Sequence, residues 1–378
     1  MNATKWTLGL AVMAALGTAH AAPSHQAFTA EQGELVAALP NTEASGIVVT
    51  PGGRTFLTLP RAGSNHKFPS VVELVKGKQV AFPDLATTTD TGKPLTDWLV
   101  SPLGMTLAGN TLWVLDEGKR PGIEGIPDGS AKLVGIDITS RKVIKTIVFH
   151  KPFIRDTEQL NDLRIDPDHG AQGTVYISNN GFSSPSDTSL VIVDIATGKM
   201  REVFHNIPET SPAPGYMTYV EGQPHAYSLD HPTMPQGGVN GIELSPDHKT
   251  LYWTNPTNPN YYSIDTATLS DFSKTDDDLH KAMHFEGQVA SNGGVAVDDK
   301  GTLYFGDASR YSIISRDKAG TFKLVGTDNR LIWPDGLYWQ GGYLYVTVGQ
   351  WQRVPGLHGG KDLRTAPYNI LRFKTSAK

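Results

Sequence analysis

The chain contains no cysteine, so disulfide bonds and metal sites built on thiolates are excluded. It has no run of basic residues and a formal net charge of −5, which argues against nucleic acid as a partner. No apolar run reaches the length needed to span a membrane. Glycine and proline are abundant instead, at 39 and 25 of 378 residues, and this composition favours short strands and turns over long helices.

The N-terminus has the composition of an export signal. Lys5 precedes a short apolar run, Leu8–Leu16, which is followed by Ala19-His20-Ala21. A basic start, a short apolar segment and a small-residue cleavage site are typical of a secretory signal peptide. We therefore expect residues 1–21 to be removed, residues 22–378 to form one domain, and the mature protein to be periplasmic or secreted.

One pattern recurs along the chain. Asn240-Gly241 opens an apolar strand, a turn follows, and an aromatic-rich second strand ends on Asn255. The pattern occurs five more times, starting at Glu43, Leu103, Asn161, Asn292 and Pro334. Six β-hairpins spread along one chain predict an all-β fold, a six-bladed β-propeller. A β-sandwich is the alternative that turn composition alone would allow.

Further strand-like runs complete the blades and predict how the ring closes. Most hairpins are followed by two such runs, which makes four strands per blade. The last hairpin is followed by one only, Tyr368–Phe373, and a spare strand, Glu34–Ala38, precedes the first hairpin. We predict that these two segments pair, because closure leaves fewer free strand edges.

In a propeller, the first strand of each blade lines the central channel. The residues predicted at its mouth include three amides and one carboxylate, those of Asn161, Asn240, Asn292 and Asp335, with Glu43 near the same position in blade one. Each amide alone also fits a turn. Together these side chains form a set of oxygen ligands suited to a divalent cation such as Ca²⁺.

Two further groups are candidates for contact with a small-molecule ligand. The ends of the second strands carry Asp116, Asn179, Asn255 and Asp307, which either hold polar parts of a ligand or cap strand ends. Three long insertions, residues 83–101, 206–238 and 349–367, should cover the same face. They carry Trp98, Tyr216, His231, Trp351 and His358, of which the two histidines are either acid–base groups or solvated loop residues.

One pair of charges on the innermost strands is predicted to be structural. Arg164 and Glu243 stand three residues after Asn161 and Asn240, in neighbouring blades. Buried charges are costly unless they are paired, so we expect an ion pair between the two blades.

The sequence resembles the Yellow and major royal jelly protein family. The stretches that carry the resemblance are residues 174–180 and 190–194, Gly241–Pro246 with Leu251–Trp253, and Ser291–Gly294. It covers nearly all of the mature chain and implies a six-bladed propeller. Members of this family are linked to dopachrome conversion and to the binding of biogenic amines.

A more distant resemblance is to the metal-dependent lactonases of the regucalcin and gluconolactonase family. It rests on Asn161–Pro167, Asn240-Gly241 and Pro334-Asp335-Gly336. In that family these positions are metal ligands, and the Asp is a proposed base. This chain departs from the pattern in blade one, where Ser45 stands at the repeat position and Glu43 lies two residues earlier.

The leading functional hypothesis is an exported metal-dependent hydrolase of a lactone or similar cyclic ester, with Asp335 as base or ligand. The alternatives are a binding protein for a small aromatic or amine ligand, and a dopachrome-type isomerase. Metal content and the effect of chelation distinguish the hydrolase from the binding protein.

Overall fold

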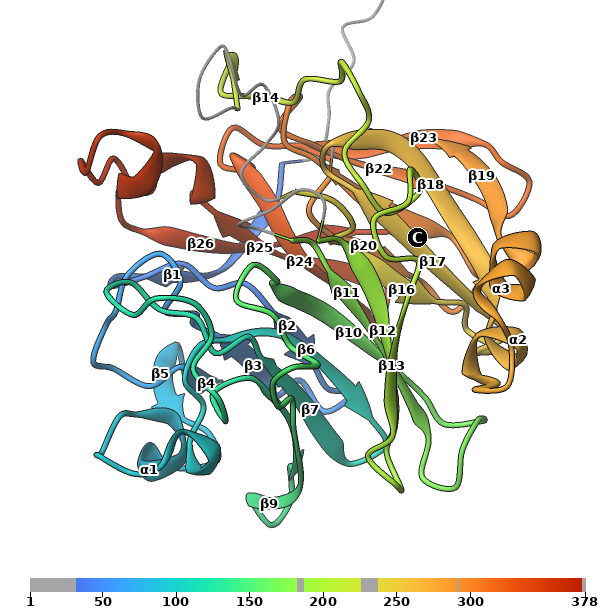
Figure 1. The fold of residues 1–378 in the computed structure, drawn as a ribbon. Coiled ribbons are helices and arrows are strands. Elements are labelled where there is room, and N and C mark those ends of the chain that lie inside the picture. The colour runs from blue at the N-terminus through green and yellow to red at the C-terminus, as the bar shows by residue number, and fades with distance from the viewer. Residues whose placement is uncertain (1–31, 182–186, 226–236, 291, 376–378) are drawn as a thin grey trace, which may run out of the picture.

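The computed structural model describes residues 32–181, 187–225, 237–290 and 292–375. Six four-stranded antiparallel sheets surround a central axis (Figure 1), which confirms the predicted six-bladed β-propeller. The first strands of neighbouring blades contact one another around the ring and line the axis. The predicted signal peptide, residues 1–21, lies outside the described residues.

The first three blades follow one another directly along the chain. Blade one consists of β2 (Ile47–Val49), β3 (Thr55–Thr58), β4 (Val71–Val75) and β5 (Lys78–Ala81). Blade two consists of β6 (Pro102–Ala108), β7 (Thr111–Asp116), β8 (Lys132–Asp137) and β9 (Lys142–Val148). Blade three consists of β10 (Leu160–Asp166), β11 (Thr174–Asn179), β12 (Ser189–Asp194) and β13 (Met200–Val203).

The remaining blades repeat this order. Blade four consists of β16 (Ile242–Leu244), β17 (Thr250–Asn255), β18 (Asn258–Asp265) and β19 (His284–Gln288), with α2 (Thr266–Ser270) and α3 (Asp276–Ala282) between the last two strands. Blade five consists of β20 (Val295–Val297), β21 (Leu303–Asp307), β22 (Ser312–Arg316) and β23 (Phe322–Thr327). Blade six consists of β24 (Trp333–Gln340), β25 (Tyr343–Gly349), β26 (Tyr368–Lys374) and the N-terminal β1 (Glu34–Leu39).

The ring closes as predicted. β1 pairs antiparallel with β26, with Glu34 opposite Arg372 and Leu39 opposite Tyr368. Arg372 Nη2 also lies 2.7 Å from Glu34 Oε2. The N-terminal strand thus covers the backbone of β26, which would otherwise be a free edge open to other chains.

The core lies between the faces of neighbouring sheets. Trp113 and Leu133 of blade two and Val175 and Val191 of blade three belong to one buried cluster. β-Branched and aromatic residues fit the pleated surface of such strands, and their alternation directs one set of side chains to each face. Because each blade packs against two neighbours, inner strands such as β3 and β11 are fully buried, whereas outer strands such as β5 and β9 are largely exposed. The residues at the channel mouth therefore stand on the buried part of the ring.

The three insertions have little regular structure. The first contains α1 (Leu85–Thr88), capped by Asp84, and the 3₁₀ helix η1 (Leu95–Asp97). The second contains the short hairpin β14 (Tyr219–Val220) and β15 (Gln223–Pro224), and the third contains η2 (Trp351–Arg353) and η3 (Pro355–Leu357). An ion pair between Glu221 and Arg353 joins the second insertion to the third.

Arg164 and Glu243 form the predicted ion pair between blades three and four. Arg164 Nε donates to Glu243 Oε1 at 2.8 Å, and Nη2 donates to Oε2 at 3.1 Å. Arg164 Nη1 also donates to Asp162 Oδ2 at 2.9 Å. Burial raises the pKa of Asp162 and of Glu243, and Arg164 opposes both shifts. One guanidinium therefore holds two buried carboxylates inside the channel.

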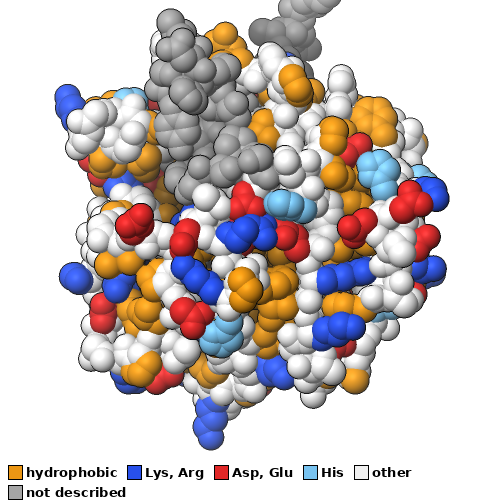
Figure 2. Space-filling view, in the orientation of Figure 1, with side chains coloured by type: hydrophobic (Ala, Val, Ile, Leu, Met, Phe, Trp, Pro, Cys, Tyr) orange, Lys and Arg blue, Asp and Glu red, His pale blue; other side chains and the backbone are white. Residues whose placement is uncertain are grey.

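No helix among the described residues is both long and apolar enough to cross a membrane. On the face shown in Figure 2, acidic and basic side chains are interspersed, with no extended area of one sign. This distribution agrees with the absence of a basic run in the sequence.

Candidate functional site

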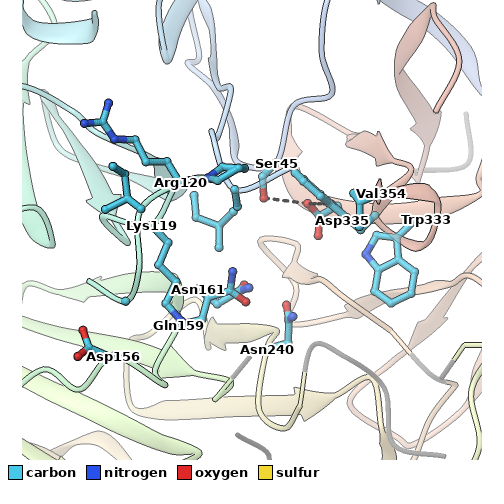
Figure 3. A pocket seen from close by; sticks show the side chains of 16 residues that line it. Ser45, Lys119, Arg120, Asp156, Gln159, Asn161, Asn240, Trp333, Asp335 and Val354 are labelled. Carbon is cyan, nitrogen blue, oxygen red and sulfur yellow. Dashed lines mark hydrogen bonds between the residues drawn. The ribbon is translucent and has the colours of Figure 1, made fainter. Parts of the chain in front are cut away.

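A cavity of about 290 Å³ opens at one end of the central channel. Five of the six blades contribute to its wall. Each does so through a residue in its first strand or just before it: Ser45, Leu103, Asn161, Asn240 and Asp335. Figure 3 shows Asp335 and Ser45 on one side, Asn161 and Asn240 near the middle, and Gln159 and Lys119 towards the other side. The repeat position identified in the sequence therefore brings Asn161, Asn240 and Asp335 to one cavity.

β-Bulges aim three of these residues at the cavity. In β6, β10 and β24, two residues stand opposite one residue of the next strand, and the pairs are Leu103-Gly104, Asn161-Asp162 and Asp335-Gly336. A bulge turns a side chain out of the regular alternation and is common beside functional sites. The glycine after Asp335 is required by packing, because a Cβ there would lie 2.1 Å from the Ser45 carbonyl oxygen.

Hydroxyl groups link the channel mouth between three pairs of neighbouring blades: one and two, three and four, and six and one. Thr58 Oγ1 donates to the Leu103 carbonyl, Ser178 Oγ to the Asn240 carbonyl and Thr347 Oγ1 to the Ser45 carbonyl, each at 2.6 Å. In each case the donor is on the second strand of one blade and the acceptor is in the next blade. These bonds fix the backbone from which the cavity side chains project.

Asp335 accepts hydrogen bonds from two other segments that line the cavity. Its Oδ2 accepts from Ser45 Oγ at 2.8 Å and from Trp351 Nε1 at 3.1 Å. Burial raises the pKa of Asp335 to about 6, and hydrogen bonds from Ser45, Trp351 and Trp333 oppose the shift. The nearby Asp162 raises the pKa further, since two buried carboxylates repel each other.

Asn240 presents an acceptor that the described protein does not satisfy. Its side chain is 3 % exposed, and Oδ1 is buried with no hydrogen-bond partner within the part of the chain that the structure describes. A buried amide oxygen without a partner costs about 1–3 kcal/mol. An atom from a ligand or an ion in the cavity would satisfy it.

Two predicted cation ligands do not line the cavity. Asn292 Oδ1 accepts from Thr254 Oγ1 at 2.7 Å, and its Nδ2 donates to the Ala290 carbonyl at 2.8 Å. The Asn292 amide thus replaces the backbone carbonyl that accepts the inter-blade bond in other blades. Glu43 is 1 % exposed and binds Arg364 Nη1 at 3.0 Å and the backbone N–H of Gln350, so it anchors the third insertion.

The polar residues at the ends of the second strands mostly cap backbone groups. Asp116 accepts from the backbone N–H groups of Val100 and Ser101 and pairs with Lys132, and Asn179 bridges several groups of blade three. Asn255 lies against Glu209 and Ser211 in the second insertion. Asp307 pairs with Arg310 and borders a separate, open pocket together with Tyr216. None of these four residues lines the central cavity.

The five residues predicted in the three insertions as ligand contacts lie in different places. Trp351 lines the cavity beside Asp335. Trp98 is buried under the guanidinium groups of Arg61 and Arg120, and His358 bonds the Gln352 carbonyl in a pocket away from the axis. Tyr216 borders the open pocket named above, and His231 lies outside the described residues.

Several residues near the cavity were not predicted as site residues, and three of them carry polar groups that face one another. Lys119 and Gln159 line it, and Glu117 lies fully buried behind Gln159. Burial lowers the pKa of Lys119 and raises the pKa of Glu117 to about 7. The signal available in the sequence was the run Asp116-Glu117-Gly118-Lys119, in which charges directly follow an apolar strand at the face with the long insertions.

A group of three possible metal ligands lies at blade three, apart from the central cavity. Ligand atoms of Asp187, Glu202 and His205 lie within 4.8 Å of one another. Arg155 already contacts this cluster, with Nε donating to Asp187 Oδ1 at 2.7 Å and Nη2 donating to Glu202 Oε1 at 2.6 Å. A guanidinium therefore balances these carboxylates.

The sequence profile of the major royal jelly protein family matches residues 108–370. The chain belongs to this family. Among curated proteins, a sequence search finds no match. For this major royal jelly protein family member, both the profile match and the ring of blades agree with the resemblance inferred from its motifs.

Solved structures similar to this family member include a regucalcin and a gluconolactonase. A calcium-binding protein, regucalcin from Agrobacterium tumefaciens, is 13 % identical with a TM-score of 0.51, over 91 % of this chain and 96 % of that chain. A gluconolactonase from Xanthomonas campestris is 14 % identical with a TM-score of 0.46, over 91 % and 99 %. At this identity, the similarity to regucalcin is one of fold.

Proposed function

We propose that this family member hydrolyses a lactone or similar cyclic ester in the axial cavity, with a divalent cation held by Asn161, Asn240 and Asp335. The observation that carries the proposal is the convergence of these three side chains from blades three, four and six on one cavity. The regucalcin-like fold and the name of that relative as a calcium-binding protein support Ca²⁺ as the first cation to test.

The residues present fit a cation of this kind. Asn240 Oδ1 lacks a partner within the described chain, and amide and carboxylate oxygens are the ligands Ca²⁺ prefers. The nearby buried charges also favour a cation. Arg164 pairs with Asp162 and Glu243, whereas Asp335 lies close enough to Asp162 for the two carboxyl groups to repel each other, and a cation beside Asp335 would relieve this repulsion.

Three features of the cavity support ester hydrolysis as the proposed reaction: a place for a cation, a carboxylate and aromatic walls. A cation held by Asn161, Asn240 and Asp335 would polarise the ester carbonyl. Asp335, oriented by Ser45 and Trp351, takes up the proton of the attacking water, and its pKa of about 6 makes it ionised at neutral pH. The water oxygen bonds to the acyl carbon, and the acyl C–O bond of the ring then breaks. The released alkoxide takes the proton back from Asp335, and a hydroxy acid leaves. The indoles of Trp333 and Trp351 restrict bulk water on this side.

The two asparagines at equivalent repeat positions give a matched test of cation binding. We expect Asn240→Ala to lower Ca²⁺ affinity at least about tenfold, as loss of a group that holds a metal does. Asn292→Ala should leave the affinity unchanged, because its oxygen accepts from Thr254 instead of facing the cavity. Calorimetric titration of both purified variants with Ca²⁺ measures the difference. Equal losses in the two variants would contradict the assignment.

Cation binding is also expected to depend on pH. Since burial raises the pKa of Asp335 to about 6, a proton competes with the cation below that pH. The apparent affinity should fall by up to about tenfold for each pH unit below 6 and level off above 7. Titrations between pH 5 and pH 8 measure this. An affinity that stays constant over the range would show that Asp335 is not a ligand.

A second candidate function is the binding of a small aromatic amine. Trp333 and Trp351 stand beside a buried carboxylate, an arrangement that holds an organic cation against aromatic faces. Membership of the major royal jelly protein family is compatible with it. The discriminating experiment is lactone hydrolysis with and without a chelator, since amine binding requires no metal and survives chelation.

We also propose that the protein is exported, on the strength of Lys5, Leu8–Leu16 and Ala19-His20-Ala21. N-terminal sequencing of protein recovered from the periplasm should begin at Ala22. Recovery of the intact N-terminus from the cytoplasm alone would refute export.

A further inference from the structure

Gln159 forms part of the cavity wall across from Asp335 (Figure 3), just before β10 begins. Its backbone is held at both ends, because its N–H donates to Asn179 Oδ1 and its carbonyl accepts from the N–H of Asn180, both at 3.1 Å. The side chain is 6 % exposed. The amide group therefore faces the cavity from a fixed position.

The buried Glu117 determines which way this amide points. Gln159 Nε2 donates to Glu117 Oε2 at 2.7 Å. The other carboxylate oxygen accepts from Ser101 Oγ at 3.1 Å, and Ser101 Oγ itself accepts the N–H of Arg61 at 3.0 Å. An ionised carboxylate only accepts hydrogen bonds, so it selects the NH₂ group of Gln159 and leaves Oε1 as the amide atom on the cavity side.

We propose that Gln159 contacts the bound ligand through Oε1, and that Glu117 is the positioning residue that makes this contact an acceptor. The ligand must then present a hydrogen-bond donor at this wall. The inference rests on the proposed function in taking the cavity as the ligand site. It narrows the substrate to a ring that carries a free hydroxyl group, as opposed to an unsubstituted cyclic ester.

The Gln159–Glu117 pair is suited to select a ligand that carries a hydroxyl group, because the polar groups of both residues are buried. A site built to bond a hydroxyl discriminates strongly against a ligand that lacks one, since the buried acceptor is then left unpaired. Lys119 and Asp116 are the charges beside Glu117, and Asp116 is itself paired with Lys132 at 2.9 Å. Burial raises the pKa of Glu117 to about 7, so the test belongs at pH 8, where the carboxylate is ionised.

The test uses two rings that cannot be hydrolysed. Anhydroglucitol is a six-membered cyclic ether with ring hydroxyls, and tetrahydropyran is the same ring without them. Their affinities for the full mature protein are measured by ligand-observed NMR at pH 8, with Ca²⁺ present. We expect the wild-type protein to bind anhydroglucitol at least about tenfold more tightly, the scale of one good hydrogen bond.

Gln159→Met should remove this preference while leaving tetrahydropyran affinity unchanged. Glu117→Gln, which keeps the shape but allows the Gln159 amide to turn, should reduce the preference severalfold. Gln340→Met, at the far end of β24, is the matched control and should retain it. A merely structural loss would weaken both rings equally, so the ratio isolates the positioning role, and thermal melting checks that each variant is folded.

The inference is overturned if the wild-type protein shows no preference, binds neither ring, or keeps its preference in Gln159→Met. The experiments distinguish failure of this inference about Gln159 from failure of the proposed lactone hydrolysis. A hydroxyl preference that Gln159→Met removes would uphold the inference even if no lactone is hydrolysed. Lactone hydrolysis with an unchanged preference in Gln159→Met would uphold the reaction alone.

Discussion

Replacing Asp335 with Asn is expected to reduce lactone hydrolysis by about a thousandfold, within the range that loss of a general base produces. The change removes the carboxylate that takes up the proton and the negative charge nearest to the proposed cation. The affinity for Ca²⁺ should fall in parallel, because an amide oxygen is a weaker ligand for a hard cation than a carboxylate. Hydrolysis rates and calorimetric titrations of the same protein preparation measure both effects.

The fold of Asp335→Asn should remain intact. Burial raises the pKa of Asp335 to about 6, so above that pH the ionised side chain makes folding less favourable than a neutral one would. An asparagine can still accept the hydrogen bonds from Ser45 and Trp351 through its oxygen. At pH 8 the variant should therefore melt at the same temperature as the wild-type protein or slightly higher.

Asp317→Asn is the control for this variant, because Asp317 lies in the exposed turn after β22 and its change should leave hydrolysis and Ca²⁺ affinity unaltered. Full hydrolytic activity in Asp335→Asn would refute the role of this carboxylate. In that case the aromatic wall formed by Trp333 and Trp351 would become the basis of the amine-binding alternative.

The second large effect is expected at the ion pair between blades three and four. Arg164→Met leaves Asp162 and Glu243 buried in the channel without their shared cation. Removing one partner of a buried ion pair costs about 3–5 kcal/mol of the free energy of unfolding. Glu243→Gln should cost less than Arg164→Met, because Arg164 keeps its bonds to Asp162 and to the Leu163 carbonyl. Denaturation in urea, followed by tryptophan fluorescence, measures both.

The cost of Arg164→Met should depend on pH in a known direction. Burial already raises the pKa of both carboxyl groups, and loss of the guanidinium raises it further. A carboxyl group whose pKa is raised in the folded state favours folding at low pH, and this stability is lost as the pH rises through the folded pKa. The variant should therefore be least impaired near pH 5 and most impaired near pH 8.

Lys281→Met is the matched control for an ion pair on the surface. Lys281 pairs with Asp277 at 2.5 Å, but both side chains are largely exposed, so the pair contributes little. Its denaturation midpoint should stay at the wild-type value. An unchanged midpoint in Arg164→Met as well would show that the channel charges are solvated and do not stabilise the ring.

Much of the fold could be predicted from the sequence because the same hairpin pattern recurs in every blade. The hairpin pattern that begins at Asn161, Asn240, Pro334 and three further positions predicted the blades, and it also pointed to residues at the channel mouth. The pairing of β1 with β26 followed from counting strands, since a ring with one strand missing at its end needs one from its start. A repeat of this kind reflects the local geometry of strands and turns, and this geometry can be recognised from the residue types at fixed positions in the sequence.

What each mouth residue does was decided by the tertiary structure. Asn240 and Asn292 stand at the same repeat position, yet the Asn240 side-chain oxygen has no hydrogen-bond partner among the described residues, whereas that of Asn292 bonds Thr254 of the preceding blade. Likewise Glu43 was drawn away from the axis by Arg364, which is 321 residues distant in the chain. The repeat determined the backbone position of each side chain, whereas hydrogen-bond partners from other blades determined the direction in which the side chain points. Those partners come together only when the ring closes. The charged run Asp116–Lys119 could be seen in the sequence, but its contact with Gln159, 42 residues further along the chain, could not.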